Sequence, residues 1–206
     1  MRTTAGAFAF LMVWAAGLST IAPGYPHGDS GETAGVAFHL GLAHPPGYPL
    51  PTLLGSLFAK LIPVGSVALR VSLLSLASAG LAAAFLAGAL RTTPALSALL
   101  GAAGGLALEV WNQMTLPKGC VYTVTVALLG ASAACLAGGA PRLRRAVLLA
   151  MLLGLAGGGH YPMVLPFVPF LIVSLAAPGV RPSARVLVRT AALGTCLLYT
   201  SDAADE

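Results

Sequence analysis

Long apolar segments separated by short polar stretches make up most of the chain. A helix needs about 20 apolar residues to cross the hydrocarbon core of a bilayer. Lipid offers the backbone no hydrogen-bonding partners, so such segments are expected to be helical. The pattern predicts an all-α, polytopic transmembrane helix bundle. Six complete spans and a truncated seventh are expected at residues 5–22, 66–90, 95–111, 120–138, 146–158, 163–176 and from about 185.

Two parts of this pattern are irregular. Residues 51–62 are apolar but too few to cross, which indicates a helix that lies at the interface or re-enters the membrane. The glycines at 157–159 and Pro162 are expected to break the helix between the fifth and sixth spans. Those two spans could form one re-entrant hairpin. Two short or tilted spans are favoured, because two crossings place the arginines that flank them on the same side of the membrane.

The composition places the chain among membrane proteins. Hydrophobic residues make up 57% and charged residues only 8%, whereas soluble domains carry about 25% charged residues. The many glycine and alanine residues fit close helix packing in lipid. These values exclude an ordinary soluble domain.

The basic residues fall in alternate loops and predict the orientation. The positive-inside rule places those loops in the cytoplasm. The amino terminus is then cytoplasmic, and the loop at 23–50 faces outward, in the periplasm if the membrane is a bacterial inner membrane. Topology accounts for the basic excess, so no nucleic-acid partner is needed. The arginines concerned are Arg2, Arg91, Arg142, Arg144, Arg145, Arg181, Arg185 and Arg189.

The last eleven residues, 196–206, depart from the pattern. They interrupt an apolar segment and hold three of the six acidic residues of the chain. The string resembles the in-frame translation of a transposase adapter used in sequencing libraries, so it is excluded from fold reasoning. The native sequence is expected to be residues 1–195, an amino-terminal part of a longer protein. Without the tail the net charge rises from +5 to +8.

Polar residues gather in the segment 28–49. It holds two of the six acidic residues, Asp29 and Glu32, and two of the four histidines, His39 and His44. The predicted topology places Glu109, Lys118 and His160 on the same outer side. Carboxylates at a membrane edge are costly and indicate function. The pattern therefore predicts an outward-facing active or binding site.

Asp29 and Glu32 allow more than one interpretation. Asp29 could cap a helix that starts at Ser30 or Gly31, with Glu32 in its first turn. On such a helix the two carboxylates would face the same way. Two close like charges raise one pKa, which suits a general base or a proton-sharing pair. They could also hold a divalent metal, although two carboxylates alone are too few ligands.

The remaining candidates have structural and functional readings. The spacing of His39 and His44 is not that of one helix face, and no cysteine completes a zinc site. Cys120 and Cys135 lie on one predicted helix about 22 Å apart, too far to pair. Arg70 lies inside a span, where its charge needs a carboxylate or a lipid phosphate. His160 is either a hydrogen-bonded interface histidine or a catalytic one.

The rigid turn His44-Pro45-Pro46-Gly47-Tyr48-Pro49 forbids helix and could preorganise a site. Several motifs around it resemble a family of multipass membrane proteins, formerly catalogued as a domain of unknown function. Its animal member is an endoplasmic-reticulum protein O-mannosyltransferase, and it belongs with the GT-C glycosyltransferases. The motifs are GDSGE at 28–32, GLAHPPGYPL at 41–50, LLGSLF at 53–58 and VALRVSLLS at 67–75, with looser matches WNQ at 111–113, VYT at 121–123 and GH at 159–160.

The resemblance implies a transferase that moves a mannose-like sugar from a polyprenyl phosphate to a hydroxyl acceptor, expected to be a protein, on the outer face. It implies that residues 1–195 are the amino-terminal part of a GT-C-like domain, inactive alone. Asp29 matches the family's catalytic aspartate, and Glu32 is taken with it. The residues expected to bind substrate are His44, Tyr48, Arg70, Glu109, Lys118, Tyr122 and His160.

One departure from the family and two other functions stay open. The family usually has a glutamate just before the Val-Tyr pair, where this chain has Cys120. The chain could therefore come from an inactive homologue. A transporter or flippase of lipid-linked sugars is the other alternative, since the predicted break at 157–162 is typical of transporter helices. No internal repeat supports it.

Overall fold

The computed structural model describes residues 2–26, 28–45, 47–138, 141–166 and 168. Within these ranges the chain is all-helical, without strands, and this confirms the predicted fold class. The helices are α1 (Arg2–Leu18), α2 (Ser30–His39), α3 (Pro49–Leu61), α4 (Val67–Ala89), α5 (Pro94–Gly105), α6 (Leu108–Met114), α7 (Gly119–Ala137) and α8 (Arg142–Val164).

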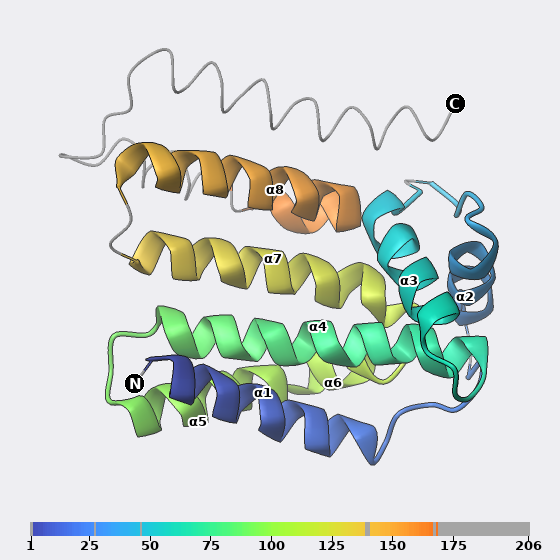
Figure 1. The fold of residues 1–206 in the computed structure, drawn as a ribbon, viewed down its shortest axis with the longest axis horizontal. Coiled ribbons are helices and arrows are strands. Elements are labelled where there is room, and N and C mark those ends of the chain that lie inside the picture. Colours follow the sequence, from blue (N-terminus) through green and yellow to red (C-terminus); the bar gives the residue numbers. More distant parts are fainter. Residues whose placement is uncertain (1, 27, 46, 139–140, 167, 169–206) are drawn as a thin grey trace.

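The long helices lie side by side in a bundle around α4 (Figure 1). Helix α4 packs against α1, α5 and α7, and α7 packs in turn against α8. Helices α2 and α3 cover one end of the bundle, where α7 begins and α8 bends. The opposite end carries the turns from α4 to α5 and from α7 to α8.

Small residues bring these helices into close contact. The backbone of Gly130 in α7 lies so near α4 that an added Cβ would stand 3.3 Å from Cβ of Phe85. A Cβ on Gly101 in α5 would stand 2.7 Å from the carbonyl oxygen of Ala83. In lipid, packing of this kind replaces the hydrophobic drive as the force that joins helices. Ser75 on α4 adds a hydrogen bond, donating to the carbonyl of Leu116 at 2.7 Å.

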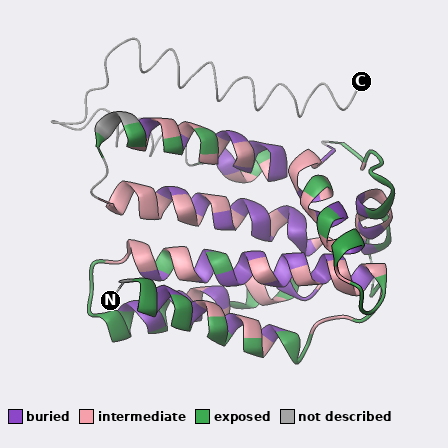
Figure 2. Ribbon diagram, in the orientation of Figure 1, coloured by how far each residue is buried: buried purple, intermediate pink, exposed green. Residues whose placement is uncertain are grey.

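Apolar side chains also cover much of the outer surface. Figure 2 shows exposed residues along α1 and α3, and these include Leu11 and Leu61, whose exposed fractions are 61% and 74%. Apolar residues on the outside of a helical bundle fit a lipid environment. Together with the helix lengths, this identifies a membrane protein.

The spans agree in part with the expected layout. Three described helices are long and apolar enough to cross a membrane, and a fourth span exists if α5 and α6, bent by 63°, act together. Helices α4, α7 and α8 correspond to the predicted second, fourth and fifth spans, and the pair α5 and α6 corresponds to the third. Helix α1 has 17 residues, short for a crossing. Most of the predicted sixth span and all of the seventh lie outside the described residues, so six spans remain a prediction.

The predicted break near residue 160 is narrower than expected. The glycines at 157–159 stay helical, and only His160 leaves helical geometry, with φ −149° and ψ 89°. Pro162 explains the kink, because its ring lacks an N–H and crowds the carbonyl four residues earlier. The predicted break is therefore present, but it is confined to a kink at His160 that separates two helical parts of α8.

Candidate active site

The loop predicted at 23–50 contains helix α2, and two tethers hold it on the bundle. The N–H of Ala22 donates to the carbonyl of Thr115 at 3.0 Å. Ser66 Oγ donates to the carbonyl of Pro23 at 2.6 Å. Both bonds tie the chain before Asp29 to the end of the bundle at which α4 and α7 begin.

Asp29 forms an ion pair with Lys118. The residue stands at the N-cap position of α2, which was one interpretation of the sequence, but its side chain does not cap the helix. Its Oδ2 accepts a hydrogen bond from Lys118 Nζ, at the start of α7. The hydrogen bond and the charge of Lys118 lower the pKa of Asp29, and the same hydrogen bond raises the pKa of Lys118.

Glu32 is bound through both of its carboxylate oxygens to His44. The backbone N–H of His44 donates to Oε1 and its ring Nδ1 contacts Oε2, each at 2.7 Å. The backbone hydrogen bond and then the ring lower the pKa of Glu32. The sequence had suggested that one carboxyl pKa would be raised by sharing a site. Both are lowered instead, because each carboxylate has its own partner.

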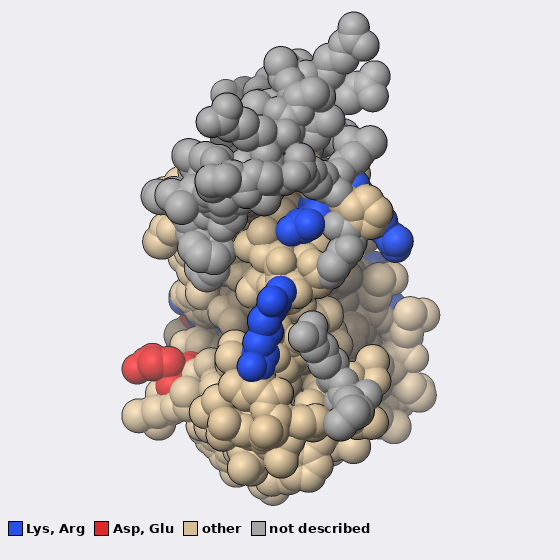
Figure 3. Space-filling model, turned by 90° about the vertical axis from the view of Figure 1, so that its left-hand side faces the viewer, with Lys and Arg blue, Asp and Glu red and all other residues tan. Residues whose placement is uncertain are grey.

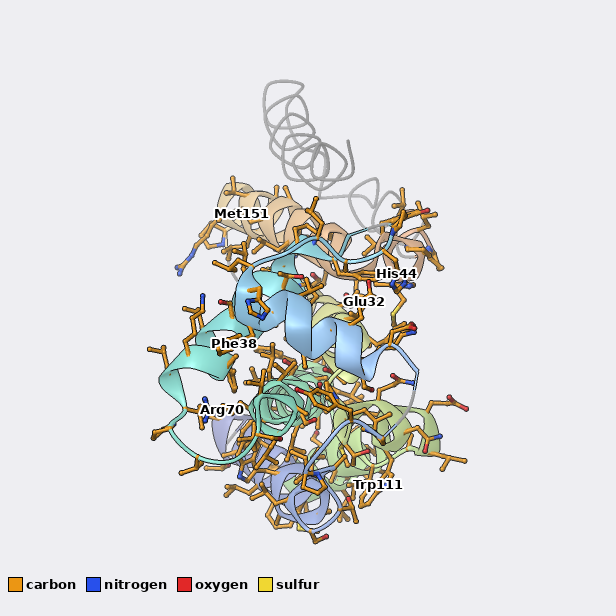
Figure 4. The ribbon with its side chains drawn as sticks, turned by 90° about the vertical axis from the view of Figure 1, so that its right-hand side faces the viewer. Glu32, Phe38, His44, Arg70, Trp111 and Met151 are labelled. Atoms are coloured by element: carbon orange, nitrogen blue, oxygen red, sulfur yellow. The ribbon has the colours of Figure 1, made fainter. Side chains whose placement is uncertain are left out.

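A row of rings continues from His44 into the bundle. The His44 ring meets Tyr48 edge-on with centroids 5.6 Å apart, and Tyr48 stacks parallel to His160 at 6.1 Å. His160 in turn lies 5.1 Å from Tyr122. Figure 4 shows Glu32 and His44 together at this end of the molecule. The row links α2, α3, α7 and α8.

Tyr48 holds an unusual backbone conformation. It precedes α3 with φ 50° and ψ 53°, in the left-handed region. Residues other than glycine, asparagine and aspartate seldom occupy this region, and such strain clusters at functional sites. Burial is the largest cause that raises the pKa of the Tyr48 phenol. The strained turn directs the Tyr48 ring toward His160.

His160 lies at the kink of α8 with one ring nitrogen buried. Its Nδ1 has no hydrogen-bond partner within the described residues. The preceding Gly159 packs so closely on α7 that an added Cβ would collide with Thr125 Oγ1. The kink and this close approach together bring His160 to the tyrosines.

Glu109 and Arg70 lie apart from this group. Glu109, on α6, lines a cavity of about 300 Å³ whose wall also includes Gln113, Tyr122 and Thr123. A more apolar cavity of about 450 Å³ shares several wall residues with it and runs between α4, α5, α7 and the end of α8. Gln113 and Thr123 were not among the expected site residues, although both belong to the looser family matches WNQ at 111–113 and VYT at 121–123.

Arg70 stabilises the turn between α3 and α4. Its guanidinium donates to the carbonyls of Ala59, Val64 and Gly65 at 2.9, 3.2 and 3.0 Å. The sequence had suggested a carboxylate or lipid phosphate as its partner. Backbone carbonyls satisfy the charge here, and Figure 4 shows Arg70 well away from Glu32 and His44.

The two ends of the bundle differ in charge. The end opposite the site carries Arg91, Arg144 and Arg145, and Figure 3 shows basic side chains on that face. Arg91 donates to the carbonyl of Ala137 at 3.2 Å, joining two turns there.

Among the described residues no three histidine, cysteine, aspartate or glutamate side chains group as metal ligands. Cys120 and Cys135 are both free, as their separation predicted.

These features define a helical membrane protein with an ionised, aromatic-lined site at one end of its bundle. The chain belongs to the family described as the Protein O-mannosyl-transferase TMEM260 N-terminal domain, whose model matches residues 29–178. The match begins at Asp29, the first residue of the site.

Two curated relatives carry the name of the same family. The chain is 60% identical over 55 residues to Protein O-mannosyl-transferase TMEM260 of Mus musculus and 44% identical over 66 residues to Protein O-mannosyl-transferase tmem260 of Dictyostelium discoideum. These alignments cover 27% and 31% of this chain and 8% of each relative. No solved structure matches the chain.

Proposed function

We propose that the full-length protein is a GT-C-type membrane glycosyltransferase. It moves a mannose-like sugar from a polyprenyl phosphate to a hydroxyl acceptor, a protein, on the outer face of the membrane. Both relatives are named protein O-mannosyl-transferases, which supports mannose as the sugar and a protein as the acceptor. The apolar helices support a lipid-borne donor, and residues 1–195 form the amino-terminal part of the transferase domain.

Asp29 is the proposed general base. Its carboxylate is ionised and half-exposed, with 39% of the side chain accessible. It can take the proton of an acceptor hydroxyl while the hydroxyl oxygen attacks the anomeric carbon. The leaving group is a phosphate, and Lys118 is better placed than Arg70 to stabilise its charge, because Arg70 is engaged by three backbone carbonyls.

The other residues of the site position the reactants. The Glu32–His44 pair holds the turn that carries Tyr48. The rings of Tyr48, His160 and Tyr122 offer apolar faces and polar edges to a sugar. The cavity beside Glu109 receives polar parts of the substrate, and the neighbouring apolar cavity receives the isoprenoid chain.

The observation that carries the proposal is the position of Asp29. Its carboxylate lies at one end of an apolar bundle, beside a cation and near a row of rings from the α2–α3 loop, α7 and α8. An acceptor and a lipid phosphate can meet at such an edge.

Replacement of Asp29 tests the proposal. In the full-length protein Asp29→Asn keeps the shape of the side chain but removes the base, so we expect sugar transfer to fall by about 100-fold or more. Asp29→Glu keeps a carboxylate and is expected to retain part of the activity. Transfer from a polyprenyl-phosphate sugar to a peptide is the measurement, with gel-filtration profiles as the control for folding. Normal transfer by Asp29→Asn would refute the assignment.

A flippase is the second candidate, favoured only by the kink at His160. Broken helices are common in transporters. Labelled lipid that crosses reconstituted vesicles without any transfer to an acceptor would support that function instead.

A further inference from the structure

Lys118 serves two groups that compete for it, if the proposed function holds. Its ammonium pairs with Asp29, which is separated from it by 89 positions in the chain. The side chains are 30% and 39% exposed, so a ligand can reach both. His44, the nearby ring, is held by Glu32, and Arg70 is held by backbone carbonyls. Lys118 is thus the ammonium that both the base and the leaving phosphate require.

The ion pair between Asp29 and Lys118 stabilises both charges in the empty site, but it makes Asp29 a weaker base for the reaction. A carboxylate held by an ammonium is a weaker base than one released from it. An ammonium, however, has three N–H donors, and among the described residues the structure gives Lys118 Nζ a single acceptor, Asp29 Oδ2. Lys118 can therefore contact a second anion before it leaves Asp29.

We propose that Lys118 changes partner during transfer, from the Asp29 carboxylate in the empty site to the phosphate of the lipid donor. This inference rests on the proposed function and adds a step to it. It makes Lys118 a catalytic residue whose contact with the phosphate strengthens as the reaction proceeds.

The movement of charge drives the exchange. The acceptor oxygen bonds to the anomeric carbon, and its proton passes to Asp29, which becomes neutral. The bond from the anomeric carbon to the phosphate oxygen breaks, and its electron pair stays on that oxygen. The donor is a phosphodiester with one negative charge, and the product is a phosphomonoester with two. Negative charge thus passes from Asp29 to phosphate, and Lys118 follows it. An interaction that is stronger in the transition state than in the ground state accelerates the step.

Binding of a phosphate lipid to the full-length protein in detergent tests the exchange. The probe is farnesyl phosphate, with farnesol as the uncharged match. Asp29→Asn removes the competing carboxylate, so we expect farnesyl phosphate to bind about two- to five-fold more tightly, the range for a partly exposed ion pair. Farnesol binding is expected to stay unchanged. If Asp29 has only a structural role, Asp29→Asn would bind farnesyl phosphate more weakly or with unchanged affinity.

Variants of Lys118 complete the cycle. Lys118→Met is expected to weaken farnesyl phosphate binding and to leave farnesol binding unchanged. In the double variant Asp29→Asn/Lys118→Met we expect no increase in the affinity for farnesyl phosphate. Lys60→Met is the matched control, since Lys60 is an exposed lysine near the end of α3. If Asp29→Asn does not fold, Lys118→Met alone decides, and unchanged farnesyl phosphate binding there overturns the exchange.

The outcomes separate this inference from the proposed function. An inactive Asp29→Asn protein that binds farnesyl phosphate no more tightly refutes the exchange but not the base. A gain that persists in the double variant also refutes the exchange. Normal sugar transfer by Asp29→Asn refutes the base itself, whatever the binding result.

Discussion

At the scale of single residues, Lys118 sets the charge of the site. Its ammonium keeps the pKa of Asp29 low, and Asp29 keeps the pKa of Lys118 high. Each group therefore holds the other in its ionised form. His44 has the corresponding effect on Glu32, whose pKa is also lowered. Asp29, Glu32 and Lys118 are therefore ionised at neutral pH.

Chemical labelling of Lys118 reports this coupling. Amine reagents attack only the neutral amine, so a raised pKa slows the reaction at a given pH. We expect Asp29→Asn to lower the pKa of Lys118, which speeds its acetylation and moves the curve of rate against pH to lower pH. Mass spectrometry of the acetylated peptides provides the rate, with Lys60 as the internal reference. An unchanged Lys118 rate would show that the ion pair does not form in solution.

Residue-scale prediction from sequence worked where the chemistry is local. The position of the helix start after Asp29 matches one interpretation of the sequence, and α2 begins at Ser30, but the expected side-chain cap does not form. The partner of Asp29 could not be read in the same way, because Lys118 comes from a distant helix end. For the same reason the sequence suggested a carboxylate or phosphate for Arg70 and missed the backbone carbonyls of its own turn.

At the scale of elements, the contact between α7 and α8 supports His160. Gly159 lies against Thr125, whose hydroxyl donates to the carbonyl of Val121 at 2.9 Å and so is fixed in place. Any side chain at position 159 must push the two helices apart. This contact explains why a glycine stands beside the kink.

Replacement of Gly159 by alanine should therefore destabilise the protein. Overpacking typically costs about 1–3 kcal/mol, which is expected to lower the melting temperature in detergent. Gly88→Ala is the matched control, because no atom lies within 4 Å of a Cβ added at Gly88 in α4. Thr125→Ala is expected to restore most of the loss in Gly159→Ala. Equal melting temperatures for the two glycine variants would contradict the close contact.

Element boundaries show where the sequence signals are strong and where they are weak. The sequence placed Pro49 in a turn and the helix at 51–62, but α3 begins at Pro49, because proline suits the first turn of a helix. The glycines at 157–159 suggested a wide break, but glycine is only mildly unfavourable in a helix, and these residues stay helical, with Gly158 near α3 and Gly159 packed on α7. The bend between α5 and α6 was not predicted, since apolar residues continue through it.

At the scale of the whole molecule, the two ends of the bundle have different chemistry. The site, with Asp29, Lys118 and His160, lies at one end, and Arg91, Arg144 and Arg145 lie at the other (Figures 1 and 3). The basic residues, which fall in alternate loops of the sequence, predicted this separation. The positive-inside rule predicts that the arginine end faces the cytoplasm.

Labelling from the two sides of the membrane tests that orientation. Leu42 is 71% exposed near the site, and Thr92 is exposed in the turn at the arginine end. We expect Leu42→Cys to react with a membrane-impermeant maleimide in intact cells, and Thr92→Cys to react only after permeabilisation. The unsubstituted protein, with its native cysteines, gives the background. Labelling of Leu42→Cys only after permeabilisation would place the site inside and remove the basis of the proposed chemistry.

The left-handed backbone of Tyr48 has an evolutionary consequence. A tyrosine in this region is less stable by about 1–2 kcal/mol than a residue that tolerates it, and glycine would relieve the strain. Selection for heat tolerance alone would therefore drift toward glycine at position 48, and the stacked ring beside His160 would disappear. If thermophilic relatives keep an aromatic residue at position 48, the ring is retained for its function in the site and not for its contribution to folding.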